Sequence, residues 1–158
     1  MLYLIPAPLH RLALRVAYRL RNRWWALTRR AGRAATLIAI DAAGRVLLVR
    51  HSYGSRRWTV PGGGLGRSED AEAGVRREMR EELGCGLTGV RLAFEVVDVI
   101  AGAEQHGYVF VARLDGGPRI DRREILECGW FERGNLPPDT MRMARVRIEQ
   151  ALGGAPAS

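Results

Sequence analysis

The chain has 158 residues and a formal net charge of +8 at pH 7, with 47% hydrophobic and 27% charged residues. This length and composition favour one globular domain with a core of its own, and they exclude a repeat or low-complexity protein. The cysteines, Cys85 and Cys128, stand in apolar surroundings, which argues against a disulfide scaffold and favours a reducing cytoplasm. Because the chain has no lysine, a Walker-type phosphate loop and Schiff-base chemistry are excluded, and arginine is the strong cation available for binding anions.

The positive charge is concentrated in residues 1–33, which hold eight arginines and no acid. Apolar residues recur at helical spacing from Leu9 to Leu27, so this segment is predicted to be a basic amphipathic helix. We rank packing of this arm on the domain or on a dimer partner first. Contact with an anionic membrane surface ranks second, and nucleic-acid binding ranks third. We therefore expect a monomer or homodimer and no specific nucleic-acid partner.

The arm is predicted to be neither a transmembrane helix nor a signal peptide. Arg11 interrupts the apolar run far short of the roughly 20 residues that a transmembrane helix needs. The first nine residues also lack the basic region that opens a signal peptide. The expected organisation is a helical arm at 1–33, one globular domain at 34–152 and a loose tail at 153–158.

Runs of β-branched and aromatic residues bounded by turn residues predict the strands of the domain. A closing helix, Thr140–Leu152, is predicted to follow them, with Asp139 as its N-cap. Trp58 is interpreted as a core residue in preference to a base-stacking platform. The predicted strands are Ala34–Asp41, Val46–Arg50, Val90–Ile100, His106–Leu114 and Glu127–Phe131.

A glycine loop, Pro61–Gly64, leads into an acidic helix in the middle of the chain. Ser68 is predicted as the N-cap of this helix, and Gly84 is predicted to end it. An apolar stripe at helical spacing would bury one face of the helix against a sheet. The residues of this stripe are Val75, Met79 and Leu83.

Glu78, Glu81 and Glu82 stand at positions i, i+3 and i+4 of the predicted helix, so their carboxylates share one edge. Such acids repel one another unless a cation lies among them, and hard oxygen ligands suit Mg²⁺ or Mn²⁺. A solvated face with pairs such as Glu72–Arg76 is the alternative, and the helix by itself favours it. The glycine loop favours the metal site, because it lets the backbone approach a ligand closely.

Together these residues resemble the Nudix box of the Nudix hydrolases, G-x(5)-E-x(7)-R-E-U-x-E-E-x-G-U, where U is a bulky apolar residue. The departure is Cys85, a smaller hydrophobic residue at the last apolar position. Gly66 and Ser68 also stand where many relatives have Glu and Gly. The matching positions are Gly63, Glu69, Arg77, Glu78, Met79, Glu81, Glu82 and Gly84.

The resemblance covers most of 34–152 and implies an α/β (α+β) fold, the Nudix-type α/β/α sandwich around a mixed sheet. It implies that Mg²⁺ or Mn²⁺ is held by the box glutamates and the Gly62 carbonyl. Arg77 would hold the acids in place. Glu69 would fix the loop, and Gly63 and Gly84 would be structural. The implied metal ligands are Gly62, Glu78, Glu81, Glu82 and Glu124.

Glu124 enters that set by resemblance. In some Nudix hydrolases a further glutamate, six positions before a tryptophan, binds metal or activates water, and Glu124 stands six before Trp130. Glu127 and Glu104 are alternatives for the same role. Either Glu78 or Glu124 would be the general base.

The implied reaction is metal-assisted attack of water on a pyrophosphate in a nucleoside diphosphate linked to another group. Nucleotide sugars, ADP-ribose-like molecules and nucleoside triphosphates all stay open, because no subgroup signature is present. Arg50, Arg56 and Arg57 are candidates for the outer phosphates from their position. The alternatives are a Nudix-fold nucleotide sensor without hydrolysis and a membrane-surface protein that acts through the arm.

Overall fold

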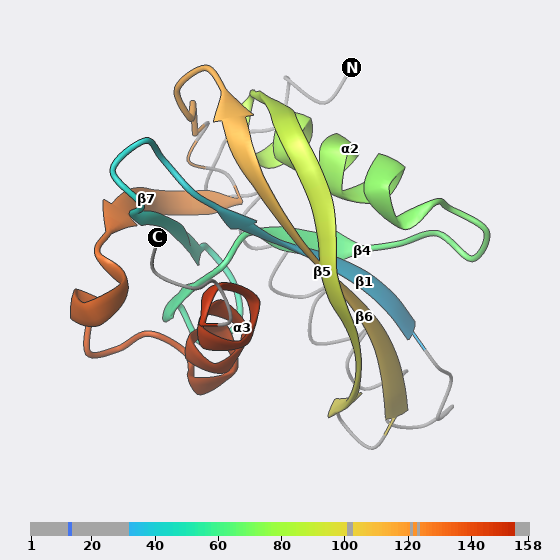
Figure 1. Cartoon of the computed structure of the whole chain (residues 1–158). Helices are drawn as coiled ribbons and strands as arrows, with labels where there is room; N and C mark the ends of the chain where they lie inside the picture. The colour runs from blue at the N-terminus through green and yellow to red at the C-terminus, as the bar shows by residue number, and fades with distance from the viewer. Residues whose placement is uncertain (1–12, 14–31, 101–102, 121, 123, 154–158) are drawn as a thin grey trace.

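The computed structural model describes residues 13, 32–100, 103–120, 122 and 124–153 (Figure 1). The predicted arm and tail lie almost entirely outside these residues, so both stay predictions. Among the described residues, no helix is long and apolar enough to cross a membrane. The elements are β1 (Gly32–Ala39), β2 (Val46–His51), β3 (Trp58–Thr59), β4 (Gly62–Gly64), α2 (Ala71–Leu83), β5 (Gly86–Ile100), β6 (Ala103–Asp115), β7 (Ile125–Phe131), the 3₁₀ turn η2 (Arg133–Asn135) and α3 (Arg142–Leu152).

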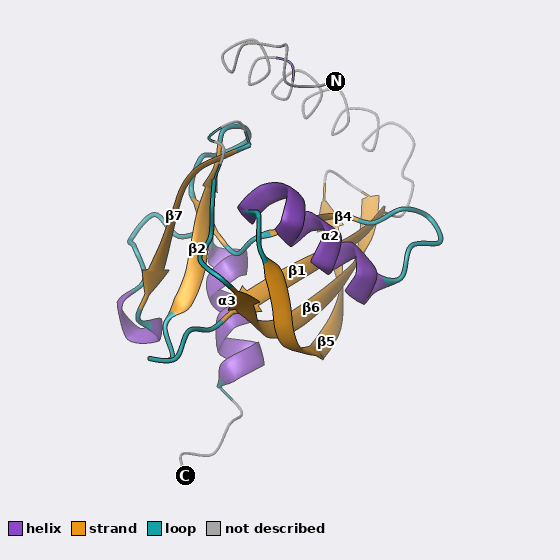
Figure 2. Cartoon of the chain, turned by 90° about the horizontal axis from the view of Figure 1, so that it is seen from above, coloured by secondary structure: helices purple, strands orange, loops and turns teal. Residues whose placement is uncertain are grey.

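The strands form a four-stranded sheet with the order β4-β1-β6-β5 and a three-stranded sheet with the order β3-β2-β7. The larger sheet is mixed, because β1 runs parallel to β6 and antiparallel to β4. Figure 1 shows α2 in the upper and α3 in the lower part of the view, with β1 and β6 passing between them. Figure 2 shows the two sheets side by side. The predicted α/β/α arrangement around a mixed sheet is confirmed.

Two hydrophobic clusters explain why the helices lie where they do. One cluster joins the predicted stripe of α2, which is fully buried, to inward residues of β1, β2 and β6. The other joins α3, through Ala144, Ile148 and Leu152, to the opposite side chains of the same strands. Trp58 belongs to this second cluster and is 9% exposed, which confirms it as a core residue.

The hairpin β5–β6, at one edge of the larger sheet, is longer than the sequence predicts. β5 begins at Gly86 instead of Val90, because the first residues of β5 pair with Asp115 and Leu114 of β6 despite two glycines of low strand propensity. β6 begins at Ala103, so the predicted connection at 101–105 is shorter. Cross-strand pairing, which is not visible in a local window, decides these boundaries.

α2 begins at Ala71, with Asp70 as its N-cap, so the prediction of Ser68 as the cap is wrong. The Asp70 carboxylate accepts a hydrogen bond from the Ala73 amide at 2.9 Å. Residues 66–69 form a turn in which the Glu69 amide donates to the Gly66 carbonyl. Because Ser68 is held in this turn, the helix starts two residues later. Gly84 ends α2 in the left-handed conformation, as predicted.

α3 begins at Arg142, so the predictions of Asp139 as the cap and of Thr140 as the first residue are wrong. The Asp139 carboxylate binds Arg50 Nη2 at 2.9 Å and is therefore engaged away from the helix. The Thr140 amide and hydroxyl both donate to the Pro137 carbonyl, which keeps Thr140 in a turn. The N-cap position is occupied by Met141, without a side-chain cap.

Met79 lies at the centre of the α2 stripe and is fully buried. We expect Met79→Ala to lower the free energy of unfolding by about 2–5 kcal/mol, because it removes buried apolar surface and leaves a cavity. Urea unfolding followed by circular dichroism measures this loss. A decrease below about 1 kcal/mol would contradict the packing of α2 against the sheets.

Candidate active site

The glycine loop lies on β4, which pairs with β1 so that Gly62 stands opposite Thr36. Gly62 has φ +154°, and a Cβ there would meet the Ala35 carbonyl oxygen at 2.3 Å. A Cβ at Gly63 would lie 2.3 Å from the carboxyl carbon of Glu78. The two glycines therefore let β4 approach β1 on one side and Glu78 on the other.

Arg77, on α2, forms ion pairs with three glutamates. Its Nε and Nη2 bind the two carboxylate oxygens of Glu69 at 2.8 and 3.1 Å. Its Nη1 donates to Glu78 Oε1 at 2.8 Å and to Glu81 Oε2 at 3.2 Å, and its Nη2 also donates to the Gly64 carbonyl. Arg77 thus joins the loop to two of the three predicted box acids, in the arrangement that a positioning role requires.

The Glu69 side chain binds the backbone of its own loop. Its Oε2 accepts a hydrogen bond from the Gly66 amide at 2.7 Å, in addition to the two bonds from Arg77. The Arg77 hydrogen bonds and the Gly66 amide lower the pKa of Glu69 to about 2. The contacts made by Glu69 are those of a residue that fixes the loop.

We expect Glu69→Gln to destabilise the protein more at pH 6.5 than at pH 3. The pKa of Glu69 is lowered from 4.5 in the unfolded chain to about 2 in the folded chain. Its contribution to stability is therefore complete above pH 4.5 and is lost as the pH falls toward 2. Urea unfolding of both proteins at the two pH values measures the difference. An equal effect at both pH values would contradict the ionic bond to Arg77.

The three box glutamates are the same residue type on the same helix, but the protein buries them to very different extents. Glu82 is 6% exposed, whereas the side chain of Glu81 is 61% exposed and that of Glu78 is 13% exposed. The Gly62 amide hydrogen-bonds the Glu82 carboxylate, but its buried Oε2 has no hydrogen-bond partner. Burial and the charges of Glu78 and Glu124 raise the pKa of Glu82 well above its usual value.

Glu124 lies close enough for its charge to raise the pKa of both Glu78 and Glu82. Its backbone carbonyl accepts a hydrogen bond from the Ser52 amide at 2.7 Å, which attaches the loop before β7 to the end of β2. The structure therefore brings Glu124 to the box acids, although more than 40 residues separate it from Glu82.

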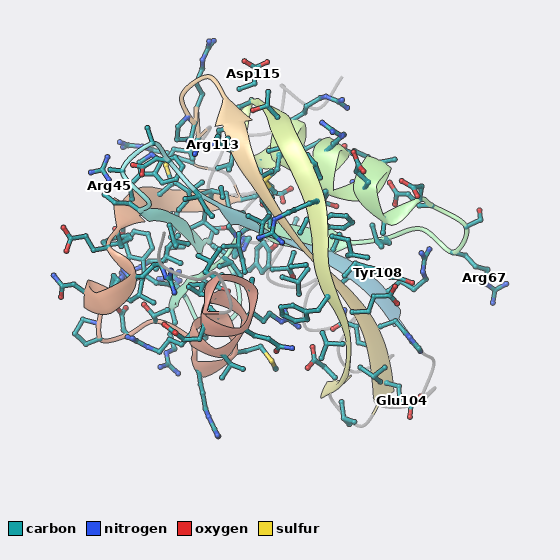
Figure 3. All side chains as sticks on the ribbon, in the orientation of Figure 1. Arg45, Arg67, Glu104, Tyr108, Arg113 and Asp115 are labelled. Atoms are coloured by element: carbon teal, nitrogen blue, oxygen red, sulfur yellow. The ribbon has the colours of Figure 1, made fainter. Side chains whose placement is uncertain are left out.

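The alternatives to Glu124 lie elsewhere. Glu127 is on β7, with Oε1 3.7 Å from Arg50 Nη1. Glu104 pairs with Val99 near the start of β6, and Figure 3 shows it at the opposite end of β6 from Asp115. Neither is among the main influences on the pKa of Glu78 or Glu82.

Two of the three arginines proposed for outer phosphates, Arg50 and Arg57, contact the segment that precedes α3. Arg50 lies over the Trp58 ring, 4.7 Å from its centroid, and binds Asp139. Arg57 donates to the carbonyls of Asp139 and Thr140. Arg56 is exposed and has φ +53°. The bonds of Arg50 and Arg57 attach β2 and the loop that follows it to the segment before α3, and contact of all three arginines with substrate stays a prediction.

The carboxylates of this site fit a divalent cation in part. In the described part of the chain, no three histidine, cysteine or carboxylate side chains are already gathered around a possible ion position. Arg77 instead binds Glu78 and Glu81, so a cation would compete with it for these carboxylates. The unpartnered Glu82 Oε2 and the mutual repulsion of Glu78, Glu82 and Glu124 nevertheless fit a hard cation with oxygen ligands.

Sequence reasoning missed two features near this site. Arg33, counted with the arginines of the arm, hydrogen-bonds the loop before α2. His51 is paired with Ile125, beside Glu124, and burial lowers its pKa to about 4. Neither contact has a local signal, because each joins residues more than 30 positions apart.

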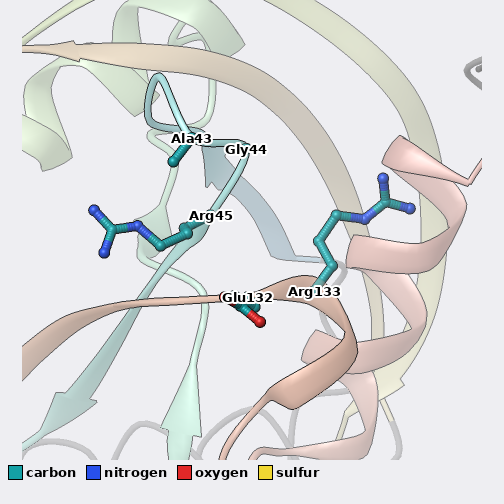
Figure 4. Close-up of a pocket in the computed structure, with 5 residues that line it drawn as sticks. All are labelled: Ala43, Gly44, Arg45, Glu132 and Arg133. Carbon is teal, nitrogen blue, oxygen red and sulfur yellow. The ribbon is translucent and has the colours of Figure 1, made fainter.

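A pocket lies away from all of these residues, between the β1–β2 turn and the start of η2 (Figure 4). It contains none of the predicted site residues, so we assign it no part in the chemistry. Its lining residues are Ala43, Gly44, Arg45, Glu132 and Arg133.

Known proteins resemble this chain in sequence and in fold. The NAD-capped RNA hydrolase NudC of Vibrio vulnificus is 31% identical over 126 residues, which are 73% of this chain and 45% of that protein. The RNA pyrophosphohydrolase of Teredinibacter turnerae is 44% identical over 56 residues, which are 35% of this chain and 33% of that protein. The chain thus spans less than half the length of these two relatives.

A crystal structure described as a MutT NUDIX hydrolase from Burkholderia pseudomallei superposes with a TM-score of 0.69 and 28% identity. The match covers 76% of this chain and 97% of that one. The family model described as NUDIX domain matches residues 30–152, which include both sheets, α2 and α3. This match covers more than half of the chain, and so the protein belongs to the NUDIX domain family.

Proposed function

We propose that this protein is a divalent-metal-dependent hydrolase that cleaves a pyrophosphate bond in a nucleoside diphosphate linked to another group. The observation that carries the proposal is the buried Glu82 carboxylate, which has an unpartnered oxygen beside the charges of Glu78 and Glu124. Burying a carboxylate with an unpartnered oxygen lowers the stability of the fold unless a ligand or a cation compensates for the lost hydration. A purely structural helix would gain by placing an apolar residue at this position.

Glu78, Glu81, Glu82 and Glu124, with the Gly62 carbonyl, would hold Mg²⁺ or Mn²⁺. Bound there, the ion would offset the phosphate charge and lower the pKa of a water molecule. The roles of the protein residues follow from their contacts. Arg77 orients Glu78, and the Gly62 amide orients Glu82.

In the reaction, the oxygen of water forms a bond to one phosphorus as the bridging P–O bond breaks. The proton of the water passes to a carboxylate oxygen of Glu78 or Glu124, and the leaving phosphate departs with the bridging oxygen. The charges of both glutamates raise the pKa of Glu82, and burial raises the pKa of Glu78, which makes it a stronger base than an exposed carboxylate.

The proposed substrate is a small nucleotide derivative, and the names of the two relatives add RNA ends to the range worth testing. We further propose a reducing, cytoplasmic location, which the unpaired Cys85 and Cys128 support. Oligomeric state and peripheral membrane contact of the arm stay predictions.

The test is release of phosphate or nucleotide from a panel of substrates, each with Mg²⁺, with Mn²⁺ and with a chelator. The panel contains nucleoside triphosphates, ADP-ribose, nucleotide sugars, dinucleoside polyphosphates and RNAs with a triphosphate or NAD 5′ end. Metal-dependent release that is absent from a Glu82→Gln preparation supports the proposal. Nucleotide binding without release from any substrate would favour a nucleotide-sensing module instead.

A further inference from the structure

Arg33, the second residue of β1, binds the loop that precedes α2 with both its backbone and its side chain. Its carbonyl accepts a hydrogen bond from the Leu65 amide at 2.9 Å. Its Nη1 donates to the Glu69 carbonyl at 2.8 Å and to the Gly66 carbonyl at 3.1 Å, with the Arg67 carbonyl at 3.4 Å. One guanidinium nitrogen thus faces three carbonyls of a single turn.

This arrangement suits arginine for two physical reasons. The carbonyls of Gly66, Arg67 and Glu69 belong to no helix or strand, so they are available to accept hydrogen bonds from a side chain. The guanidinium is planar and offers several N–H donors in a fixed geometry, whereas an ammonium is a compact, strongly hydrated charge. Tyr108 of β6 also lies under the guanidinium, with its ring centroid 5.3 Å from Cζ, and holds it over the loop.

The loop bound by Arg33 carries the first member of a chain of bonds that leads to the box acids. Gly66 and Glu69 are linked to each other through the Gly66 amide and the Glu69 carboxylate. The same carboxylate binds Arg77 twice, and Arg77 binds Glu78. A shift of this turn would therefore move Glu69, then the Arg77 guanidinium, and then the carboxylate of Glu78.

We propose that Arg33 is a positioning residue of the active site, which fixes the loop at 66–69 and thereby the orientation of Arg77 and Glu78. The part of this inference that concerns turnover rests on the proposed function. The part that concerns the loop does not, because it follows from contacts that a structural measurement can test.

The experiment compares Arg33→Ala and Arg33→Lys with the wild-type full chain. Arg45→Ala is the matched control, since Arg45 is an exposed arginine in the turn between β1 and β2 that binds Asp41 and does not contact the loop. Hydrogen exchange followed by mass spectrometry reports the loop peptide and α3 separately. Steady-state kinetics on a substrate from the proposed panel that the wild type hydrolyses gives kcat and KM.

In Arg33→Ala we expect exchange in the loop peptide to rise by about tenfold or more, while exchange in α3 stays at the wild-type rate. We expect kcat to fall by about 10- to 100-fold with KM changed less than about threefold, because the acids are misplaced while substrate contacts remain. Arg33→Lys should resemble Arg33→Ala, and Arg45→Ala should match the wild type in both measurements.

A double variant with Glu69→Gln tests whether Arg33 acts through the loop. If it does, the combined loss of kcat is smaller than the product of the two single losses. Wild-type exchange in the loop of Arg33→Ala, faster exchange over the whole domain, or full recovery by lysine would each overturn the inference. If the wild type hydrolyses no substrate, the proposed function fails, and the exchange data still decide whether Arg33 holds the loop.

Discussion

Glu82→Gln is expected to lower kcat by about 10³-fold or more, because it removes the central carboxylate of the proposed metal site. The fold should be retained. Glutamine has the shape of glutamate, and its side-chain carbonyl can still accept the hydrogen bond from the Gly62 amide. Metal-dependent turnover and far-ultraviolet circular dichroism measure the two effects.

The matched control is Glu72→Gln on the same helix. Glu72 pairs with Arg76 at 2.8 Å on a partly exposed surface and does not contact the box acids. We expect less than a twofold change in kcat for this variant. Near-normal turnover of Glu82→Gln, or an equal loss in Glu72→Gln, would remove Glu82 from the reaction.

Stability gives a second, independent measurement on Glu82→Gln. Folding raises the pKa of Glu82 above its unfolded value of 4.5, so the folded chain binds the proton more tightly. Wild-type stability therefore falls as the pH rises from 4.5 through the folded pKa, and glutamine removes this dependence. In the presence of chelator, the Tm of the variant should exceed that of the wild type at pH 8 by more than at pH 4.5. A Tm of Glu82→Gln below that of the wild type at pH 8 would contradict the idea that burying the ionised Glu82 carboxylate destabilises the protein.

Gly63→Ala is expected to lower kcat by about 100-fold with a small change in stability. The new Cβ would lie 2.3–2.6 Å from three atoms of the Glu78 carboxyl group, so that group must move. It is the flexible end of a side chain, which makes the displacement tolerable for the fold. Its new position, however, would no longer match the geometry set by Arg77. Kinetics and thermal unfolding of the same preparation separate the two effects.

Gly64→Ala is the control, one residue along the same strand. A Cβ at Gly64 meets no atom within 4 Å, and its φ is not in the left-handed region. We expect kcat within about twofold of the wild type. Equal losses in both variants would indicate a general effect of alanine on β4 and would speak against the specific contact with Glu78.

The local pattern was sufficient to find the box. The spacing of Glu78, Glu81 and Glu82 and the stripe of Val75, Met79 and Leu83 each follow the helical period, and the stripe is fully buried. Both features depend on residues three or four positions apart. A helix places such residues on one face whatever surrounds it.

The ends of the elements were predicted less well. Ser68 and Asp70 are both good N-caps by residue type, and a turn at residues 66–69 decides between them. Asp139 is an equally good cap by type, yet Arg50 binds its carboxylate. A local turn excludes Ser68 as the cap, whereas Asp139 is bound by a residue distant in sequence.

The sequence by itself determined which residues form the candidate site, because helical geometry and the fixed spacing of the box place the acids together. The tertiary structure alone decided how these residues differ. It buries Glu82, leaves Glu81 exposed, brings Glu124 alongside and makes Arg33 a partner of the loop. The physical reason is that burial, electrostatic coupling and long-range hydrogen bonds depend on which surfaces meet, and that is settled only when the sheets and helices pack together.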